Sequence, residues 1–100
     1  MNNNELQKEV LQWASDRHLL SKDNALKQLA KTMSELGELA DAIIKNDHAG
    51  VVDGLGDVQV TLIILANQLD INYDGALNCA WDEIKNRKGK TVNGTFIKES

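Results

Sequence analysis

Residues 24–46 read NALKQLAKTMSELGELADAIIKN, and this stretch decides the fold. Its apolar side chains recur every three or four positions, which is the period of an α-helix with one apolar face. The pattern predicts a helix of about 20 residues, longer than the average of about 11–12. We expect its apolar stripe to face the core. The stripe contains Leu26, Leu29, Ala30, Met33, Leu36, Ala40, Ile43 and Ile44.

The segments on either side of this helix show the same period. They predict further helices at about 5–20, 49–69 and 74–88, in addition to the one at 24–46. Asn93-Gly94 stands between short runs of β-forming residues, which predicts a hairpin at about 91–98 with a type I′ turn. The predicted fold class is all-α: one domain over residues 1–100, a four-helix bundle-like arrangement with a short C-terminal β-hairpin or arm.

The helix predicted at 49–69 is apolar on all faces from Val58 onward. Within a chain of 100 residues, one subunit covers only part of such a helix. An uncovered patch of Val60, Ile63 and Ile64 is rare on a soluble monomer. The pattern therefore predicts an obligate homodimer packed through this helix.

The composition narrows the class of protein. Apolar residues make up 42% of the chain and the net charge is −4, so a nucleic-acid partner is not expected. A single cysteine, Cys79, excludes an internal disulfide and a cysteine-based zinc site. The polar start, Met1 to Val10, carries no secretory signal, and the apolar stretch 58–66 is too short to span a bilayer. We therefore expect a cytoplasmic protein without a membrane partner.

Two pairs of acids suggest a metal site. Glu35 and Glu38 are three residues apart on one predicted helix, and Asp53 and Asp57 are four apart on the next. An antiparallel turn between the helices would bring both pairs to the same height. Carboxylates that face one another are tolerated when they share a hard cation, Mg²⁺ or alternatively Mn²⁺. The other interpretation is a solvated acidic face, in which Lys31 pairs with Glu35.

Glycines and cations add to this pattern. Gly54 and Gly56 interrupt a strong helix, and Gly37 lies between the two glutamates, as expected where a ligand or another helix approaches closely. Basic residues gather at 85–90, with no Gly-rich phosphate-binding loop and no Ser-His or Cys-His pair in the sequence. They are candidate phosphate contacts, or they only complement a helix dipole. The candidate phosphate-binding residues are Lys31, Lys85, Arg87 and Lys88.

These residues together resemble the MazG-like branch of the all-α nucleoside triphosphate pyrophosphohydrolases, in particular its short phage-type members. The resemblance covers nearly the whole chain, including the segments 13–17, 28–31 and 83–96. The motifs that carry it most clearly are Ser34-Glu35-Leu36-Gly37-Glu38-Leu39-Ala40 and Asp53-Gly54-Leu55-Gly56-Asp57-Val58.

The family signature is Glu-x-x-Glu followed by Glu-x-x-Asp, which binds Mg²⁺. Glu35, Glu38 and Asp57 match it. Gly54 stands where the family has a third glutamate, and Asp53 is the expected substitute. The resemblance thus implies metal binding by Glu35, Glu38, Asp53 and Asp57, with Glu38 and Glu35 as catalytic residues.

The activity implied is hydrolysis of nucleoside triphosphates, with ribose or deoxyribose, to the monophosphate and pyrophosphate, of a house-cleaning type. Trp13 and Trp81 are candidates to stack on the base, although their helical spacing favours a core position. The family resemblance also allows a homotetramer beyond the homodimer. The alternative function is a catalytically weak or inactive helical dimerisation or nucleotide-binding module of the same fold, which the missing glutamate favours.

Overall fold

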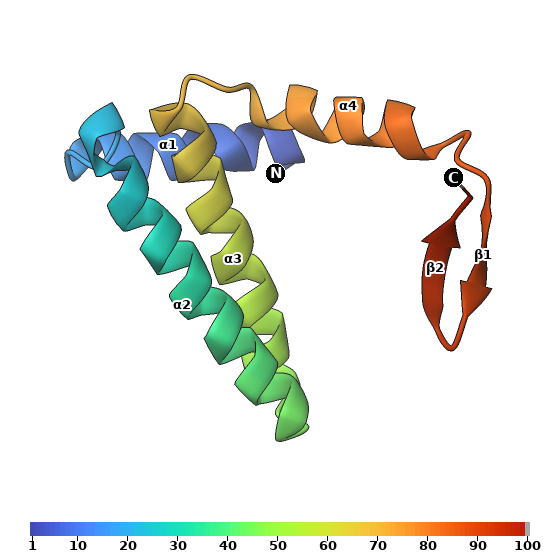
Figure 1. Ribbon diagram of the computed structural model, residues 1–100. Coiled ribbons are helices and arrows are strands. Elements are labelled where there is room, and N and C mark those ends of the chain that lie inside the picture. Colours follow the sequence, from blue (N-terminus) through green and yellow to red (C-terminus); the bar gives the residue numbers. More distant parts are fainter. Residues whose placement is uncertain (100) are drawn as a thin grey trace.

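The computed structural model describes residues 1–99, and within them the chain is helical apart from a terminal hairpin (Figure 1). The predicted all-α class with a C-terminal arm is confirmed. The hairpin is antiparallel, pairs Val92 with Thr95, and turns at Asn93 and Gly94, both with positive φ. The elements are α1 (Asn3–Asp16), the 3₁₀ turn η1 (Lys22–Asn24), α2 (Ala25–Ile44), α3 (His48–Gln68), α4 (Tyr73–Ile84), β1 (Gly89–Val92) and β2 (Thr95–Lys98).

Side-chain caps set three of the helix starts. Asn2, Asp47 and Asn72 each accept a hydrogen bond from the backbone N–H three residues on, at 2.9, 3.0 and 2.7 Å. Two predicted ends were wrong by four residues. Helix α1 stops at Asp16 because the chain turns back through His18, whose φ is 60°. Helix α4 stops at Ile84, and the basic residues after it lie on the connection to β1.

Helices α2 and α3 form an antiparallel hairpin, the most extensive contact in the fold (Figure 1). The turn between them is made by Asn46, with φ of 56°, and by the cap residue Asp47. Helix α1 packs across α3, and the side-chain amides of Gln28 and Gln68 join segments that are distant in the sequence. The Gln28 side chain donates a hydrogen bond to the Thr61 carbonyl at 3.0 Å, and Gln68 donates to the Leu19 carbonyl at 2.7 Å.

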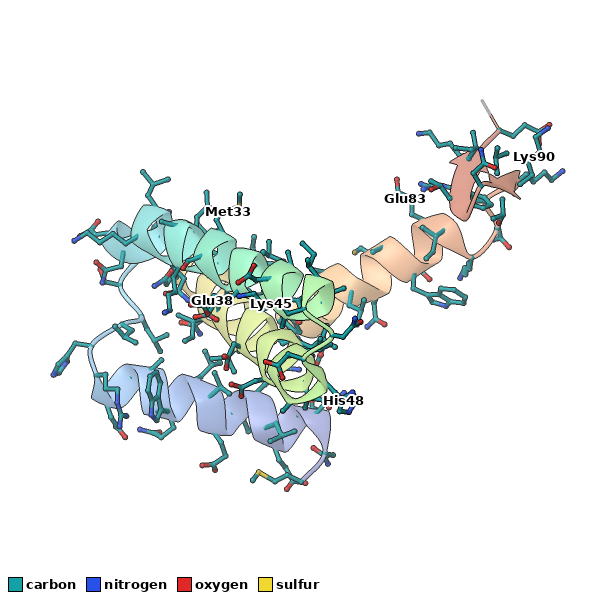
Figure 2. The ribbon with its side chains drawn as sticks, turned by 90° about the horizontal axis from the view of Figure 1, so that it is seen from below. Met33, Glu38, Lys45, His48, Glu83 and Lys90 are labelled. Atoms are coloured by element: carbon teal, nitrogen blue, oxygen red, sulfur yellow. The ribbon has the colours of Figure 1, made fainter. Side chains whose placement is uncertain are left out.

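The face of α2 that carries its apolar stripe is turned away from α3, so the predicted core position of that stripe was wrong. Leu26 is 80% exposed and Ile44 is 78% exposed. The opposite face of α2 packs against α3, and its buried residues are Thr32, Glu35 and Ala42. Figure 2 shows Met33 pointing away from α3, on the other side of α2 from Glu38. The apolar face of α2 is therefore not covered by any other described part of this chain.

The expectation for α3 also needs correction. Ile64 is only 3% exposed and belongs to the core of the single chain, while Val60 and Ile63 are half-buried beside α1. The amino-terminal helix thus covers the patch that was expected to meet a second subunit. Trp13 and Trp81 are 48% and 57% exposed, so neither is a core residue.

The chain is too open for a self-contained domain of its size. Its radius of gyration is 16.1 Å, against about 13 Å for a compact domain of 100 residues. It exposes 7806 Å², whereas a compact monomer of its mass exposes about 5,600 Å². Among residues 1–99, no large side chain is fully buried. The single chain therefore leaves much of its apolar surface exposed.

Helix α4 and the hairpin, which we call the arm (residues 73–98), account for part of this openness (Figure 1). The first turn of α4 is fastened to α1, because the Gln7 amide donates a hydrogen bond to Asp74 at 2.8 Å. Apart from this hydrogen bond, the backbone of α4 comes close to that of α3 alone, and the hairpin comes close to none of the other described elements. Every described residue from Ala76 onward is exposed.

Helix α3 is long and apolar enough, by length and composition, to cross a membrane, with a mean hydropathy of 1.6. The apolar stretch 58–66, on which the expectation from the sequence rests, is shorter than α3. The conclusion that this stretch is too short to span a bilayer therefore does not apply to the whole helix. A core helix of a soluble bundle passes the same test, and α3 is packed between α1 and α2.

Two glycines of α3 predict alanine substitutions that change the stability of the protein in opposite directions. A Cβ on Gly54 would lie 3.1 Å from Leu39 Cβ and 3.2 Å from its Cα, whereas one on Gly56 would meet nothing within 4 Å. We therefore expect Gly54→Ala to lower the melting temperature by forcing α2 and α3 apart. Gly56→Ala should raise stability by about 1 kcal/mol, through helix propensity alone. Thermal unfolding of both variants checks this pair, and a stabilising Gly54→Ala would contradict the close approach.

Candidate metal and nucleotide site

An acidic pocket of about 260 Å³ lies at the turn end of the α2–α3 hairpin. It combines the acids of both predicted pairs, since Glu38 comes from α2 and Asp53 and Asp57 come from α3. Asp47, the cap of α3, adds a carboxylate whose position follows from the helix start. Buried Gly54 forms part of the wall where the two helices approach most closely. The full lining is Glu38, Asp41, Ala42, Lys45, Asp47, Gly50, Asp53, Gly54 and Asp57.

Glu35 lies one turn before Glu38 and is the buried acid of α2, with 9% of its side chain exposed. The Lys31 ammonium forms an ion pair with its Oε1 at 3.0 Å. A hydrogen bond from Lys31 is the largest influence on Glu35 and lowers the pKa of that carboxyl. The same contact raises the pKa of Lys31, and the charges of Glu38 and Asp57 add to the effect. Lys31 is thus a cation that the fold holds beside Glu35.

Glu38 has the opposite shift. Hydrogen bonding to Glu35, followed by the negative charge of Glu35, raises the pKa of Glu38, and Asp57 on α3 contributes in the same direction. The charged form of Glu38 is therefore disfavoured by its surroundings. A carboxylate in this situation gains from a proton or from a cation.

The donor set fits a hard divalent cation. All candidate ligands are carboxylate oxygens, which Mg²⁺ and Mn²⁺ prefer. Glu35 Oε2 is buried and accepts no hydrogen bond from any described residue, which is costly for a charged oxygen. Among residues 1–99, no group of three His, Cys, Asp or Glu side chains is placed to hold an ion in common. The ligand atoms are thus of the kind that binds a hard cation, although the described side chains are not arranged around one point. Glu38, Asp53 and Asp57 are exposed, so their side chains are free to rotate toward an ion.

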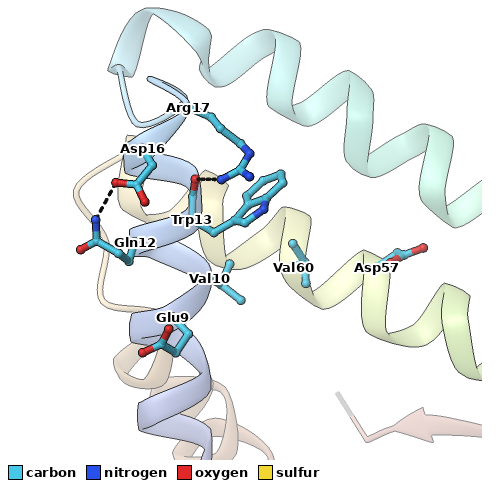
Figure 3. Close-up of a pocket in the computed structure, with 8 residues that line it drawn as sticks. All are labelled: Glu9, Val10, Gln12, Trp13, Asp16, Arg17, Asp57 and Val60. Carbon is cyan, nitrogen blue, oxygen red and sulfur yellow. Dashed lines mark hydrogen bonds between the residues drawn. The ribbon is translucent and has the colours of Figure 1, made fainter.

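A second, larger cleft of about 680 Å³ opens between α1 and α3 (Figure 3). Trp13 lies in its wall with the Arg17 guanidinium 4.2 Å from the centre of the ring, and Arg17 also donates a hydrogen bond to the Trp13 carbonyl at 2.9 Å. Asp57 lines both this cleft and the acidic pocket, so the two cavities adjoin. The remaining lining residues are Glu9, Val10, Gln12, Asp16 and Val60.

Arg17 is a site candidate that the sequence reasoning missed. The available signal was its spacing from Trp13, because residues four apart on a helix are neighbours. The arginine and tryptophan together present a flat, electron-rich surface backed by a cation.

The structure leaves the other predicted phosphate and base contacts far from this site. Lys85 and Arg87 follow α4 and pair with their neighbours, Lys85 with Asp82 at 2.9 Å and Arg87 with Glu83 at 3.7 Å. Lys88 and Trp81 also belong to the arm and line neither cavity. Figure 2 shows Lys90, in the same basic run, well apart from Glu38.

Comparisons with known proteins identify the family of the chain. The family model described as the MazG nucleotide pyrophosphohydrolase domain matches residues 24–92, which leaves α1 outside the match. The chain is also 40% identical over 68 residues to an uncharacterized 18.2 kDa protein from the rep-hol intergenic region of Haemophilus phage HP1 (strain HP1c1). That match covers 68% of this chain but 42% of the relative, so the chain spans less than half of the relative's length. No solved structure matches.

Proposed function

Because the chain belongs to the MazG nucleotide pyrophosphohydrolase family, we propose that it hydrolyses nucleoside triphosphates to the monophosphate and pyrophosphate. The observation that carries this proposal is the acidic pocket. The fold aligns Glu38, Asp53 and Asp57 along one cavity, next to a buried glutamate with an unsatisfied oxygen. A house-cleaning role, removing unwanted nucleotides, is the biological setting that we propose for this activity.

Glu35, Glu38, Asp53 and Asp57 are the residues that would hold Mg²⁺, or Mn²⁺ in its place. A divalent cation bound there offsets the charge that builds on phosphoryl oxygens during hydrolysis. The carboxylates themselves gain from this charge, since hydrogen bonding to Glu35 and then the negative charges of Glu35 and Asp57 raise the pKa of Glu38. Asp53 takes the part of the glutamate that is absent at position 54, because it shares the pocket with Asp57.

The proton chemistry falls to Glu38. In the hydrolysis, a water oxygen forms a bond to phosphorus, the bridging phosphorus–oxygen bond breaks, and pyrophosphate leaves with the electron pair. Glu38, once ionised, accepts the proton that the attacking water loses. Glu35 lies beside it and keeps Lys31 near the phosphates, and Lys31 provides positive charge for the developing oxyanions.

The nucleobase takes the cleft between α1 and α3. Its volume of about 680 Å³ is ample for a base and sugar, and Trp13 offers a face for stacking. Because Asp57 borders both cavities, a base in the cleft would point its triphosphate toward the acidic pocket. Trp81 would reach a base only from the arm of another subunit.

The chain functions as a homo-oligomer in this proposal. Its surface exceeds that of a compact monomer by roughly 2,200 Å², and a standard interface buries only about 800 Å² per partner. The exposed stripe of α2 and the exposed arm are separate apolar surfaces. Each is sufficient for one kind of interface, so a homodimer through one surface extends to a homotetramer through the other.

A second candidate function is an inactive module of the same fold. Gly54 favours it, because the position that carries a family ligand here packs against Leu39 instead. Such a protein would bind nucleotides or assemble without hydrolysis.

Pyrophosphate release separates the two candidates. The purified protein is incubated with each common nucleoside and deoxynucleoside triphosphate, with Mg²⁺, with Mn²⁺ and with a chelator. We expect metal-dependent release of pyrophosphate and the monophosphate, and its loss in Asp57→Asn. Metal-dependent nucleotide binding without any release would support the inactive module and overturn the enzyme.

The same assay tests Asp53. Removal of a group that only orients a metal ligand costs about 10–100-fold. We therefore expect Asp53→Asn to lower activity at least tenfold, nearly as much as Asp57→Asn. Asp41→Asn is the matched control, because Asp41 lines the same pocket but pairs with Lys45 at 3.0 Å. If Asp53→Asn behaves like Asp41→Asn, Asp53 is not a ligand.

A further inference from the structure

The arm carries a surface that complements the tip of the α2–α3 hairpin. Residues 85–98 hold five basic residues and no acid, whereas residues 35–57 hold six acids and one lysine, Lys45. Within one chain these two surfaces do not meet, since the hairpin contacts no other described element. A charge imbalance of this kind on separate parts of one fold points to a partner that brings them together.

Exposed apolar residues accompany the charges on both surfaces. On the arm, Leu77, Trp81 and Phe96 are 66%, 57% and 50% exposed. At the tip, Val52 and Leu55 are 60% and 51% exposed, close along the chain to the acids of the pocket. Such patches are seldom left in water. The segment 85–98 thus combines exposed Phe96 with positive charge, and the tip combines exposed apolar residues with an excess of acids.

From these observations we propose that the arm docks on the tip of the α2–α3 hairpin of a second copy and supplies cations to the acidic pocket of that copy. This inference rests on the proposed function for its catalytic consequence. The docking is reciprocal in a two-fold pair, because each chain offers one arm and one tip.

The cations most available for this role are Lys88 and Lys90. Neither forms an ion pair within the part of the chain that the structure describes, whereas Lys85 and Arg87 are paired with Asp82 and Glu83. Lys88 lies on the connection that follows α4, and Lys90 lies in β1. In the partner's pocket they would face the triphosphate, whose charge the pocket acids cannot offset.

Zero-length cross-linking tests the docking without any need for activity. Unlabelled and ¹⁵N-labelled chains are mixed after reversible unfolding, treated with a carbodiimide, digested and analysed by mass spectrometry. We expect Lys88 or Lys90 linked to Asp47, Asp53 or Asp57, with about half of these links joining a light to a heavy chain, as random pairing of identical subunits requires. The pair Lys31–Glu35 must link within single chains only, which serves as the internal control.

Two results would overturn the proposal. Links between the arm and the tip that are never mixed in isotope would mean that the arm folds back on its own chain. An absence of such links, while Lys31–Glu35 links form, would mean that the arm does not reach an acidic pocket at all.

Subunit complementation tests the catalytic consequence. Lys88→Ala/Lys90→Ala loses the arm cations, and Asp57→Asn loses an acid of the pocket, so each alone should fall at least tenfold in activity. A mixture of the two should recover about a quarter of wild-type activity, because half of the random pairs then contain one complete site. The double variant Lys22→Ala/Lys27→Ala removes equal charge elsewhere and should keep full activity. A mixture no better than its components would show that the cations act within one chain.

The two readouts separate the docking from the function. A wild-type protein that is inactive with every triphosphate overturns the hydrolase, and mixed-isotope links in that protein still support the docking. An active wild type without mixed links overturns the docking alone.

Discussion

Replacement of Glu38 by glutamine is expected to abolish pyrophosphate release and, with it, the stabilisation of the protein by Mg²⁺. Glu38 is the acid that receives the proton in the proposed reaction, and removal of a general base costs about 10²–10⁴-fold in rate. It is also a proposed ligand. A cation that binds only the folded state at 100 times its Kd raises the melting temperature of a small domain by on the order of 10 °C. Glu38→Gln should show no such rise.

The metal-free protein provides the contrasting result. Contact with Glu35 raises the pKa of Glu38 in the folded state, so ionisation of Glu38 favours unfolding. The contribution of Glu38 to stability is full below its unfolded pKa and is lost as the pH rises through the higher folded pKa. At neutral pH without metal, Glu38→Gln should therefore melt no lower than wild type. Thermal unfolding with and without Mg²⁺, at acidic and neutral pH, measures both effects.

Asp41→Asn is the control for these experiments, because it removes one charge from the same pocket outside the proposed ligand set. It should retain the Mg²⁺ shift. If neither Mg²⁺ nor Mn²⁺ stabilises the wild type, with or without nucleotide, the acids are a solvated face and the metal proposal fails.

A charge on the outer face of α2 should separate the subunits. The exposed apolar residues of this helix recur at alternating intervals of three and four, which is the spacing of a coiled-coil seam. Met33 lies in the middle of the seam and is 62% exposed in the single chain. Met33→Glu should therefore leave the α2–α3 hairpin folded but break this interface, so that the mass of the assembly falls by half, to the pair of 11.0 kDa chains that the arms still join. The seam is Leu26, Leu29, Met33, Leu36, Ala40 and Ile43.

Sedimentation measures the mass, and circular dichroism shows whether the helices persist. Lys27→Glu places a new charge on the same helix outside the seam and should leave the assembly intact. Ile64→Glu is not a usable test, because Ile64 is buried within its own chain and the substitution would unfold it. A wild type that sediments as a stable monomer at micromolar concentration would contradict the proposed assembly.

The sequence alone determined most of the secondary-structure elements and the spacing of the candidate site residues along the chain. The period of residues 24–46 predicted α2, the same period predicted α3, Asn93-Gly94 predicted the hairpin, and the motifs around Glu35 and Asp57 predicted the family. These features are local or depend on fixed spacing along one helix, so they can be recognised in a single amino-acid sequence. The helix ends at Asp16 and Ile84 were less predictable, because the pattern continued past the point where the chain turned.

Only the tertiary structure decided which face of each helix is covered. Periodicity shows that α2 has an apolar stripe, but it cannot show whether that stripe meets α3 or a second molecule. Here α3 packs on the side of α2 that holds Thr32, Glu35 and Ala42, and α1 lies beside Val60 and Ile63. The same holds for the cleft at Trp13, since its two walls come from helices forty residues apart in the sequence. Burial depends on contacts between segments that are distant in the sequence. The hydrophobic effect is non-directional, so it favours contact with any apolar surface and does not select a particular partner.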